Sequence, residues 1–105
     1  MIDHIHLFVA NLEEGKRFYA AALASLGYGV LREGDGYCGI GPMEGPEKWI
    51  GTIWLSEGRD IQPLHIAFRV KERSVVDRFY KDALKAGGTD NGAPGIRAEY
   101  HDAYY

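Results

Sequence analysis

The stretch HIHLFVANLEEGKRFYAAALASLG, residues 4–27, decides the fold, because the chain repeats it 61 positions further on. The second copy, HIAFRVKERSVVDRFYKDALKAGG, covers residues 65–88 and matches the first without a gap at nine of 24 positions. Ordinary composition would give about one or two identities by chance. A unit that occurs only twice indicates a duplicated supersecondary element, since a solenoid needs at least three repeats.

Each copy predicts a strand followed by a helix. In the first strand, residues 2–9, alternation places apolar side chains on one face and His4, His6 and Phe8 on the other. Asn11 offers a helix N-cap with Glu14 at the reciprocal position, and Gly27 ends the helix. The second copy predicts a strand over residues 64–70, with His65 opposite the apolar face. It also predicts a helix in which Ser74 and Asp77 form a capping-box-like start and the glycines at 87–88 form the end.

Three more strands complete the first unit. Asp35-Gly36 is a strong hairpin signal and joins predicted strands over 28–32 and 37–41. A loop over 42–47 leads to a strand over 48–56, and residues 57–63 link the units. The first unit, about 1–61, is therefore strand–helix–strand–strand–strand. Only 17 residues follow Gly88, with room for one short strand in 96–105, so the second unit, about 62–105, is expected to be incomplete.

Composition limits the classes of function. The 105 residues form one domain, and a net charge of −3 offers no footprint for nucleic acid or an anionic membrane. We expect no membrane span and no signal peptide, hence a cytoplasmic protein. The single Cys38 has no internal disulfide partner, which fits a reducing compartment, and we interpret it as a small buried hydrophobe on a strand.

His4 and His65 occupy the same place in the two copies. If a pseudo-twofold axis relates the copies, both imidazoles can face one cavity and hold a divalent metal. The alternative is that each is an ordinary polar residue on a half-exposed strand. His6 shares the face of His4. Arg69, beside His65, either pairs with an anionic group in the cavity or forms a surface ion pair.

The repeat resembles the vicinal oxygen chelate superfamily, which includes glyoxalase I, extradiol dioxygenases, and bleomycin- and fosfomycin-resistance proteins. In the first half the resemblance rests on Asp3-His4-Ile5 leading to Val9, Leu12-Glu13, Arg17-Phe18-Tyr19 and Leu26-Gly27-Tyr28. In the second half it rests on His65-Ile66-Ala67-Phe68, Asn91-Gly92-Ala93-Pro94-Gly95, Glu99-Tyr100-His101 and Tyr104-Tyr105. It implies an α+β fold of duplicated βαβββ modules, whose mixed sheet curls around a cavity, with the second module incomplete here.

The resemblance also implies a site. His4 and His65 match the metal-ligand positions on the first strand of each module, for a divalent ion such as Zn, Ni, Mn or Fe. The strand that usually brings a carboxylate ligand is missing, so the set is incomplete and metal binding is expected to be poor. Glu57, Glu99 and His101 are the first places to seek another ligand. The substrate cavity is expected to include His6, Phe8, Arg69, His101 and Tyr104.

Three functions follow as alternatives. The first is a metal-dependent enzyme, a lyase or oxygenase acting on a small molecule with adjacent oxygens. The second is a metal-free protein that binds or sequesters a small molecule in an aromatic cavity, as bleomycin-resistance proteins do. The third is a truncated member without activity. A strand over 64–70 would have few partners, so we also expect a homodimer in which the incomplete second halves meet.

Overall fold

The computed structural model describes residues 1–46 and 48–105, so residue 47, the last of the predicted loop, lies outside the described residues. The order of elements is β1 (His4–Val9), α1 (Leu12–Ala22), a 3₁₀ turn (Ala24–Leu26), β2 (Tyr28–Gly34), β3 (Tyr37–Pro42), β4 (Thr52–Glu57) and α2 (Arg73–Lys85). The fold is α+β, as predicted. No helix in the described part of the chain is long and apolar enough to cross a membrane.

The four strands form one mixed, open sheet in the order β1-β4-β3-β2. β4 pairs parallel with β1 and antiparallel with β3, and the β2–β3 hairpin turns at Gly36, whose φ of 77° lies in the left-handed region that favours glycine. The first unit is therefore the βαβββ module that the sequence predicts. β1 and β2 are the two edges of the sheet.

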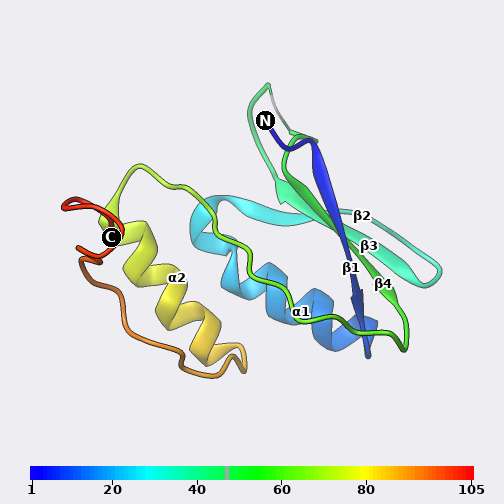
Figure 1. The fold of residues 1–105 in the computed structure, drawn as a ribbon. Coiled ribbons are helices and arrows are strands. Elements are labelled where there is room, and N and C mark those ends of the chain that lie inside the picture. Colours follow the sequence, from blue (N-terminus) through cyan, green and yellow to red (C-terminus); the bar gives the residue numbers. More distant parts are fainter. Residues whose placement is uncertain (47) are drawn as a thin grey trace.

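The core lies between the sheet and α1. Leu7 of β1, Ile40 of β3 and Leu23 after α1 are buried against Ile53 and Leu55 of β4. The apolar face of β1 therefore packs toward the helix, as its alternation predicts. Figure 1 shows α2 on the far side of α1 from the sheet, and its contacts are with α1 and the 3₁₀ turn. The second helix therefore covers a helix instead of a sheet.

Several predicted boundaries of helices and strands are wrong. α1 ends at Ala22, and the 3₁₀ turn fills the gap to Gly27, which has φ 79°. Residues 48–51 form a turn, so β4 begins only at Thr52. The N-cap of α2 is Glu72 without a side-chain hydrogen bond. Ser74 lies inside that helix, and Asp77 instead accepts a hydrogen bond of 2.7 Å from the hydroxyl of Tyr105.

The second unit has no strand among the described residues. Residues 62–70, which include the predicted strand over 64–70, contain no helix, turn or bend and pair with no other strand of the described chain. Just before them, the backbone N–H of Ile61 donates a hydrogen bond of 3.1 Å to the carbonyl of Arg59. Residues 96–105, where the sequence leaves room for one short strand, contain turns at 98–100 and 102–103 and no strand. β pairing needs a neighbouring backbone as well as a suitable pattern, and within these 105 residues the other strands of the second module are absent. The second module is therefore incomplete.

The N-cap of α1 gives a first test of the fold. Asn11 is extended, and its side-chain oxygen accepts a hydrogen bond of 3.0 Å from the backbone N–H of Glu14. Asn11→Ala leaves that donor unsatisfied and should lower the free energy of unfolding by about 1 kcal/mol. Urea unfolding followed by circular dichroism measures the change. Asn91→Ala, in an exposed turn, is the matched control and should unfold like the parent; equal stability of all three proteins would contradict the cap.

Cys38 gives a second test. Its side chain is fully buried on β3, and burial raises the pKa of the thiol. Because the thiolate is the reactive form, Cys38 should ionise only at a pH above that of an ordinary cysteine and resist a thiol reagent at pH 8. Mass spectrometry should show labelling only after unfolding in urea, whereas an Ala103→Cys variant should react at once at its exposed new thiol. Rapid labelling of Cys38 in the native protein would refute its burial.

Candidate functional site

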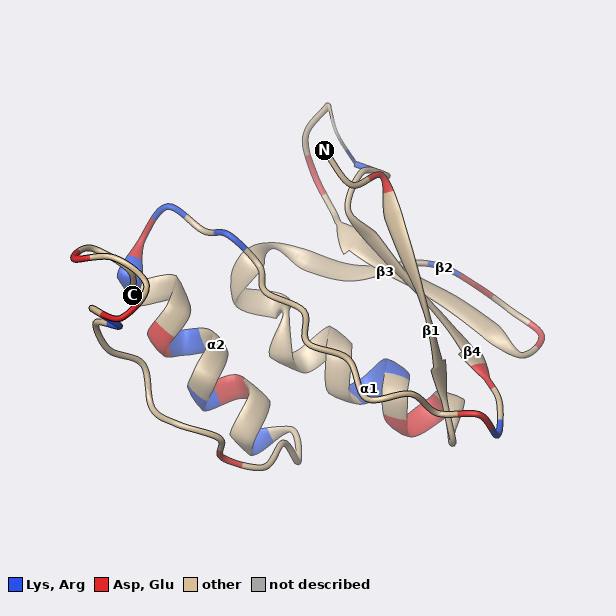
Figure 2. Cartoon of the chain, in the orientation of Figure 1, with Lys and Arg blue, Asp and Glu red and all other residues tan. Residues whose placement is uncertain are grey.

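The open face of the sheet, opposite α1, carries a group of polar and aromatic side chains. Alternation along β1 and β4 places the buried side chains toward the helix and their neighbours on the other face. A hollow of about 280 Å³ lies there, lined by His4, His6, Tyr37, Trp54 and Ser56. Figure 2 shows no Lys, Arg, Asp or Glu along β1, and Glu57 at the end of β4 is the acidic residue of that strand. We call this hollow the sheet-face site.

Two histidines of β1 are held by hydrogen bonds. Nδ1 of His4 lies 2.7 Å from Oδ1 of Asp3, and the carboxylate accepts the Nδ1 proton, which orients the imidazole and leaves Nε2 as its other polar atom. Nε2 of His6 lies 2.8 Å from Oγ of Ser56 on β4. The site therefore offers one oriented imidazole and one imidazole–hydroxyl pair to a bound molecule.

Aromatic rings form the rest of the site. Trp54 lies 6.5 Å from Trp49 between ring centroids, with the two planes only 8° apart, and 6.2 Å from Tyr37. Gly39 makes room for this arrangement, because a Cβ there would lie 2.6 Å from the ring of Trp54. A hydrogen bond holds the turn that carries Trp49, because the hydroxyl of buried Thr52 donates to the carbonyl of Trp49 at 2.6 Å.

The residues predicted for one shared cavity line separate hollows. His65 lies in a second hollow, between α2 and the C-terminal turns, whose lining includes Tyr80 and Tyr104 and shares no residue with the sheet-face site. His101 is exposed, and its ring lies 5.4 Å from that of Tyr104. Arg69 lines a third hollow beside Ile5. Their roles in binding stay predictions, and a single chain does not bring them all to one cavity.

The other predicted positions have local partners. Phe8 is half exposed, and its ring lies 4.9 Å from that of His6, so it stands next to the sheet-face site. Oε2 of Glu57 accepts a hydrogen bond of 3.3 Å from the backbone N–H of Leu12, at the start of α1. Glu99 lies exposed in a C-terminal turn.

The sheet-face site has few donor atoms that could ligate a metal ion. The sheet-face site supplies two imidazoles and two hydroxyls, those of Ser56 and Tyr37, and among residues 1–46 and 48–105 no three His, Cys, Asp or Glu side chains gather closely enough to hold an ion. Tight binding of a divalent metal ordinarily takes three or more protein ligands. The described residues of this chain therefore do not make up the ligand set of a resident metal.

Sequence reasoning missed Tyr37, Trp54 and Ser56. The signal was present, since Thr52, Trp54 and Ser56 alternate with Ile53 and Leu55 along β4. What the sequence lacked was the pairing of β4 with β1 and β3, which sets Trp54 opposite both His6 and Gly39.

Comparison with solved structures gives two informative likenesses. The chain matches a glyoxalase/bleomycin resistance protein from Albidiferax ferrireducens at TM-score 0.69 and 24% identity, over 93% of this chain and 82% of the other. It matches a hypothetical protein from S. aureus at TM-score 0.63 and 21% identity, over 92% and 76% of the two chains. No protein-family model and no curated protein matches it. The chain therefore has the glyoxalase/bleomycin resistance fold, which confirms at the level of the fold the resemblance found in the sequence.

The place of Gly39 against Trp54 can be tested directly. Gly39→Ala puts a methyl group where the Trp54 ring now lies, so the ring must move and the near-ultraviolet circular dichroism should change. The crowding should cost about 1–3 kcal/mol of unfolding free energy. Gly95→Ala is the control, because its new methyl would approach only the guanidinium end of the Arg97 side chain, at 3.2 Å, and no backbone or ring atom. A Gly39→Ala spectrum identical to the parent's would show that the ring does not rest on Gly39.

Proposed function

We propose that this chain binds a small, planar organic molecule at the sheet-face site without a resident metal. The observation that carries the proposal is the juxtaposition of Trp54 and Tyr37 with His4, His6 and Ser56 in one hollow. Ligand sites typically combine apolar and aromatic walls with a few well-placed polar groups that fix orientation. This set has that composition.

The chemistry of the side chains defines the ligand class. The face of Trp54 offers stacking to a flat ring. Nε2 of His4 accepts a hydrogen bond in the neutral imidazole and donates one in the protonated form, since Nδ1 is bonded to Asp3, while Ser56 can donate or accept. A planar ring that carries a hydroxyl or carbonyl group would use both kinds of contact. The fold of a glyoxalase/bleomycin resistance protein is compatible with such binding, although a fold does not itself define a function.

A metal-dependent lyase or oxygenase is the competing function. The absence of a third suitable ligand among the described residues argues against it for the isolated chain. The two functions differ in one measurable respect, which is whether ligand binding needs a divalent ion.

Binding can be tested with 2-naphthol, a flat aromatic molecule with one hydroxyl. Titration into the full chain, followed by isothermal titration calorimetry, should show saturable binding that EDTA does not change. Trp54→Leu should weaken binding roughly 2- to 10-fold, since an aromatic contact contributes about 0.5–1.5 kcal/mol beyond its buried area. Tyr100→Leu, in the exposed C-terminal turn, is the control and should bind like the parent.

Two results would overturn this proposal. One is binding that appears only after Zn, Ni, Mn or Fe is added, which would support the metal-dependent alternative. The other is equal loss of binding in the Trp54 and Tyr100 variants, which would place the ligand elsewhere.

A further inference from the structure

The hollow that His65 lines, between α2 and the C-terminal turns, has mainly aromatic walls. Its volume is about 680 Å³, which is within the range of about 300–1,000 Å³ that is typical of ligand pockets. Four tyrosines line it: Tyr80 from α2, and Tyr100, Tyr104 and Tyr105 from the C-terminal segment. Figure 1 shows that segment, in red, beside the start of α2. We call this space the tyrosine hollow.

Contacts within the chain hold the walls of the tyrosine hollow in place. The hydroxyl of Tyr105 donates a hydrogen bond of 2.7 Å to Asp77 of α2, and the guanidinium of Arg73 lies 4.9 Å from the centre of the Tyr105 ring. Tyr100 and Tyr104 pack edge to face, with ring centroids 5.1 Å apart. Rings that are already in position cost less conformational entropy when a ligand binds.

Two basic side chains, Arg97 and His65, also line the tyrosine hollow. Nη2 of Arg97 donates a hydrogen bond of 2.7 Å to the carbonyl of Ala93, which uses one of the five N–H groups of the guanidinium. Gly95 leaves space beside the other terminal nitrogen, because a Cβ there would lie 3.2 Å from Nη1. The backbone therefore positions the guanidinium, and its other N–H groups remain for a bound molecule.

The positive charge of Arg97 has no acidic partner within residues 1–46 and 48–105. No described Asp or Glu lines the tyrosine hollow. Two carboxylates bond to residues that do line it, but each accepts from an uncharged donor: Asp77 from Tyr105, and Asp90 from the backbone N–H of Gly92 at 2.9 Å. An anionic ligand would supply the partner that Arg97 lacks.

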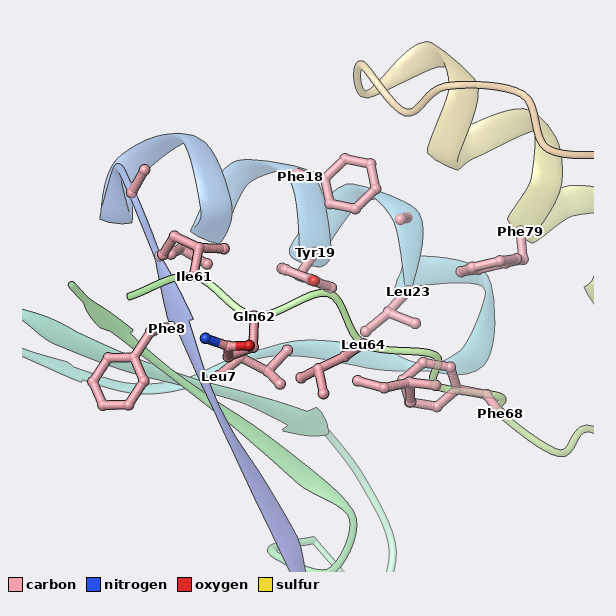
Figure 3. Close-up of a pocket in the computed structure, with 14 residues that line it drawn as sticks. Leu7, Phe8, Phe18, Tyr19, Leu23, Ile61, Gln62, Leu64, Phe68 and Phe79 are labelled. Atoms are coloured by element: carbon pink, nitrogen blue, oxygen red, sulfur yellow. The ribbon is translucent and has the colours of Figure 1, made fainter. Parts of the chain in front are cut away.

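Two other hollows of the molecule lack this combination. The apolar hollow beside α1, which Figure 3 shows with Leu7, Leu23, Leu64 and Phe68 around it, has no charged side chain in its lining. The sheet-face site has aromatic rings but no Lys or Arg. Arginine stays charged at any physiological pH. Of these three hollows, the tyrosine hollow therefore suits a flat ring that carries a negative charge.

We propose that the tyrosine hollow binds an aromatic carboxylate and is a second ligand site of this chain. The planar guanidinium of Arg97 matches a carboxylate with two parallel hydrogen bonds. A ring N–H of His65 supplies another donor, and the tyrosine rings pack against the ring of the ligand. The proposal does not depend on binding at the sheet-face site, since the two hollows share no lining residue.

Two probes with the same ring test the proposal: 2-naphthoate, which is charged, and 2-naphthamide, which is not. Isothermal titration calorimetry on the full chain should show saturable binding of 2-naphthoate, about tenfold or more tighter than binding of 2-naphthamide, because hydrogen bonds to a charged group are the stronger ones. Trp54→Leu, which alters only the sheet-face site, should keep this preference.

Substitution of Arg97 tests the role of its guanidinium. Arg97→Gln should weaken binding of 2-naphthoate about tenfold or more and leave binding of 2-naphthamide nearly unchanged. Arg97→Lys keeps the charge but not the planar fork, so it should recover part of the loss. Arg78→Gln is the matched control, because Arg78 is exposed on α2 outside the lining of the hollow, and it should bind like the parent.

Each of the following results would overturn the proposal. The first is a parent that does not bind 2-naphthoate saturably or that binds both probes equally. The second is an Arg97→Gln protein that binds like the Arg78→Gln control, or that loses both probes to the same extent, which would limit Arg97 to holding the turns. The third is loss of 2-naphthoate binding in Trp54→Leu, which would place the ligand at the sheet-face site. Failure of 2-naphthol to bind would contradict only the function proposed for the sheet-face site.

Discussion

Burial of β4 beneath α1 is the interaction on which the rest of the structure depends. β4 is paired on both edges, parallel to β1 and antiparallel to β3, and its Ile53 and Leu55 are completely buried in the core. A strand with a fixed register has only two faces. Once Ile53 and Leu55 face the helix, Trp54 and Ser56 must face the open side, beside the histidines of β1.

The sheet-face site is therefore a consequence of core packing. Its aromatic and polar side chains are the residues that alternate with the core, and their supports come from the same strands. Asp3 orients His4, Ser56 pairs with His6, and the hydroxyl of Thr52 holds the turn that carries Trp49. A site placed on strands in this way is held more precisely than one built from loops.

The second half of the chain shows what happens to the same pattern without partners. The sequence around His65 matches that around His4 closely enough to predict a strand, and the helix after it forms as expected. The strand does not form, because no neighbouring backbone accepts or donates its hydrogen bonds. α2 accordingly packs its apolar face on α1.

The sequence by itself determined the elements that depend on local chemistry and periodicity. These are the faces of β1, the Asn11 cap, the hairpin at Gly36, the left-handed glycines that end the helices and the βαβββ order of the first unit. Only the tertiary structure decided which strands lie side by side, and hence that Trp54 meets His6 and that His4 and His65 line different hollows. The physical reason is that alternation assigns a side chain to a face, whereas a site also requires the neighbour across the ladder, which is distant in the sequence.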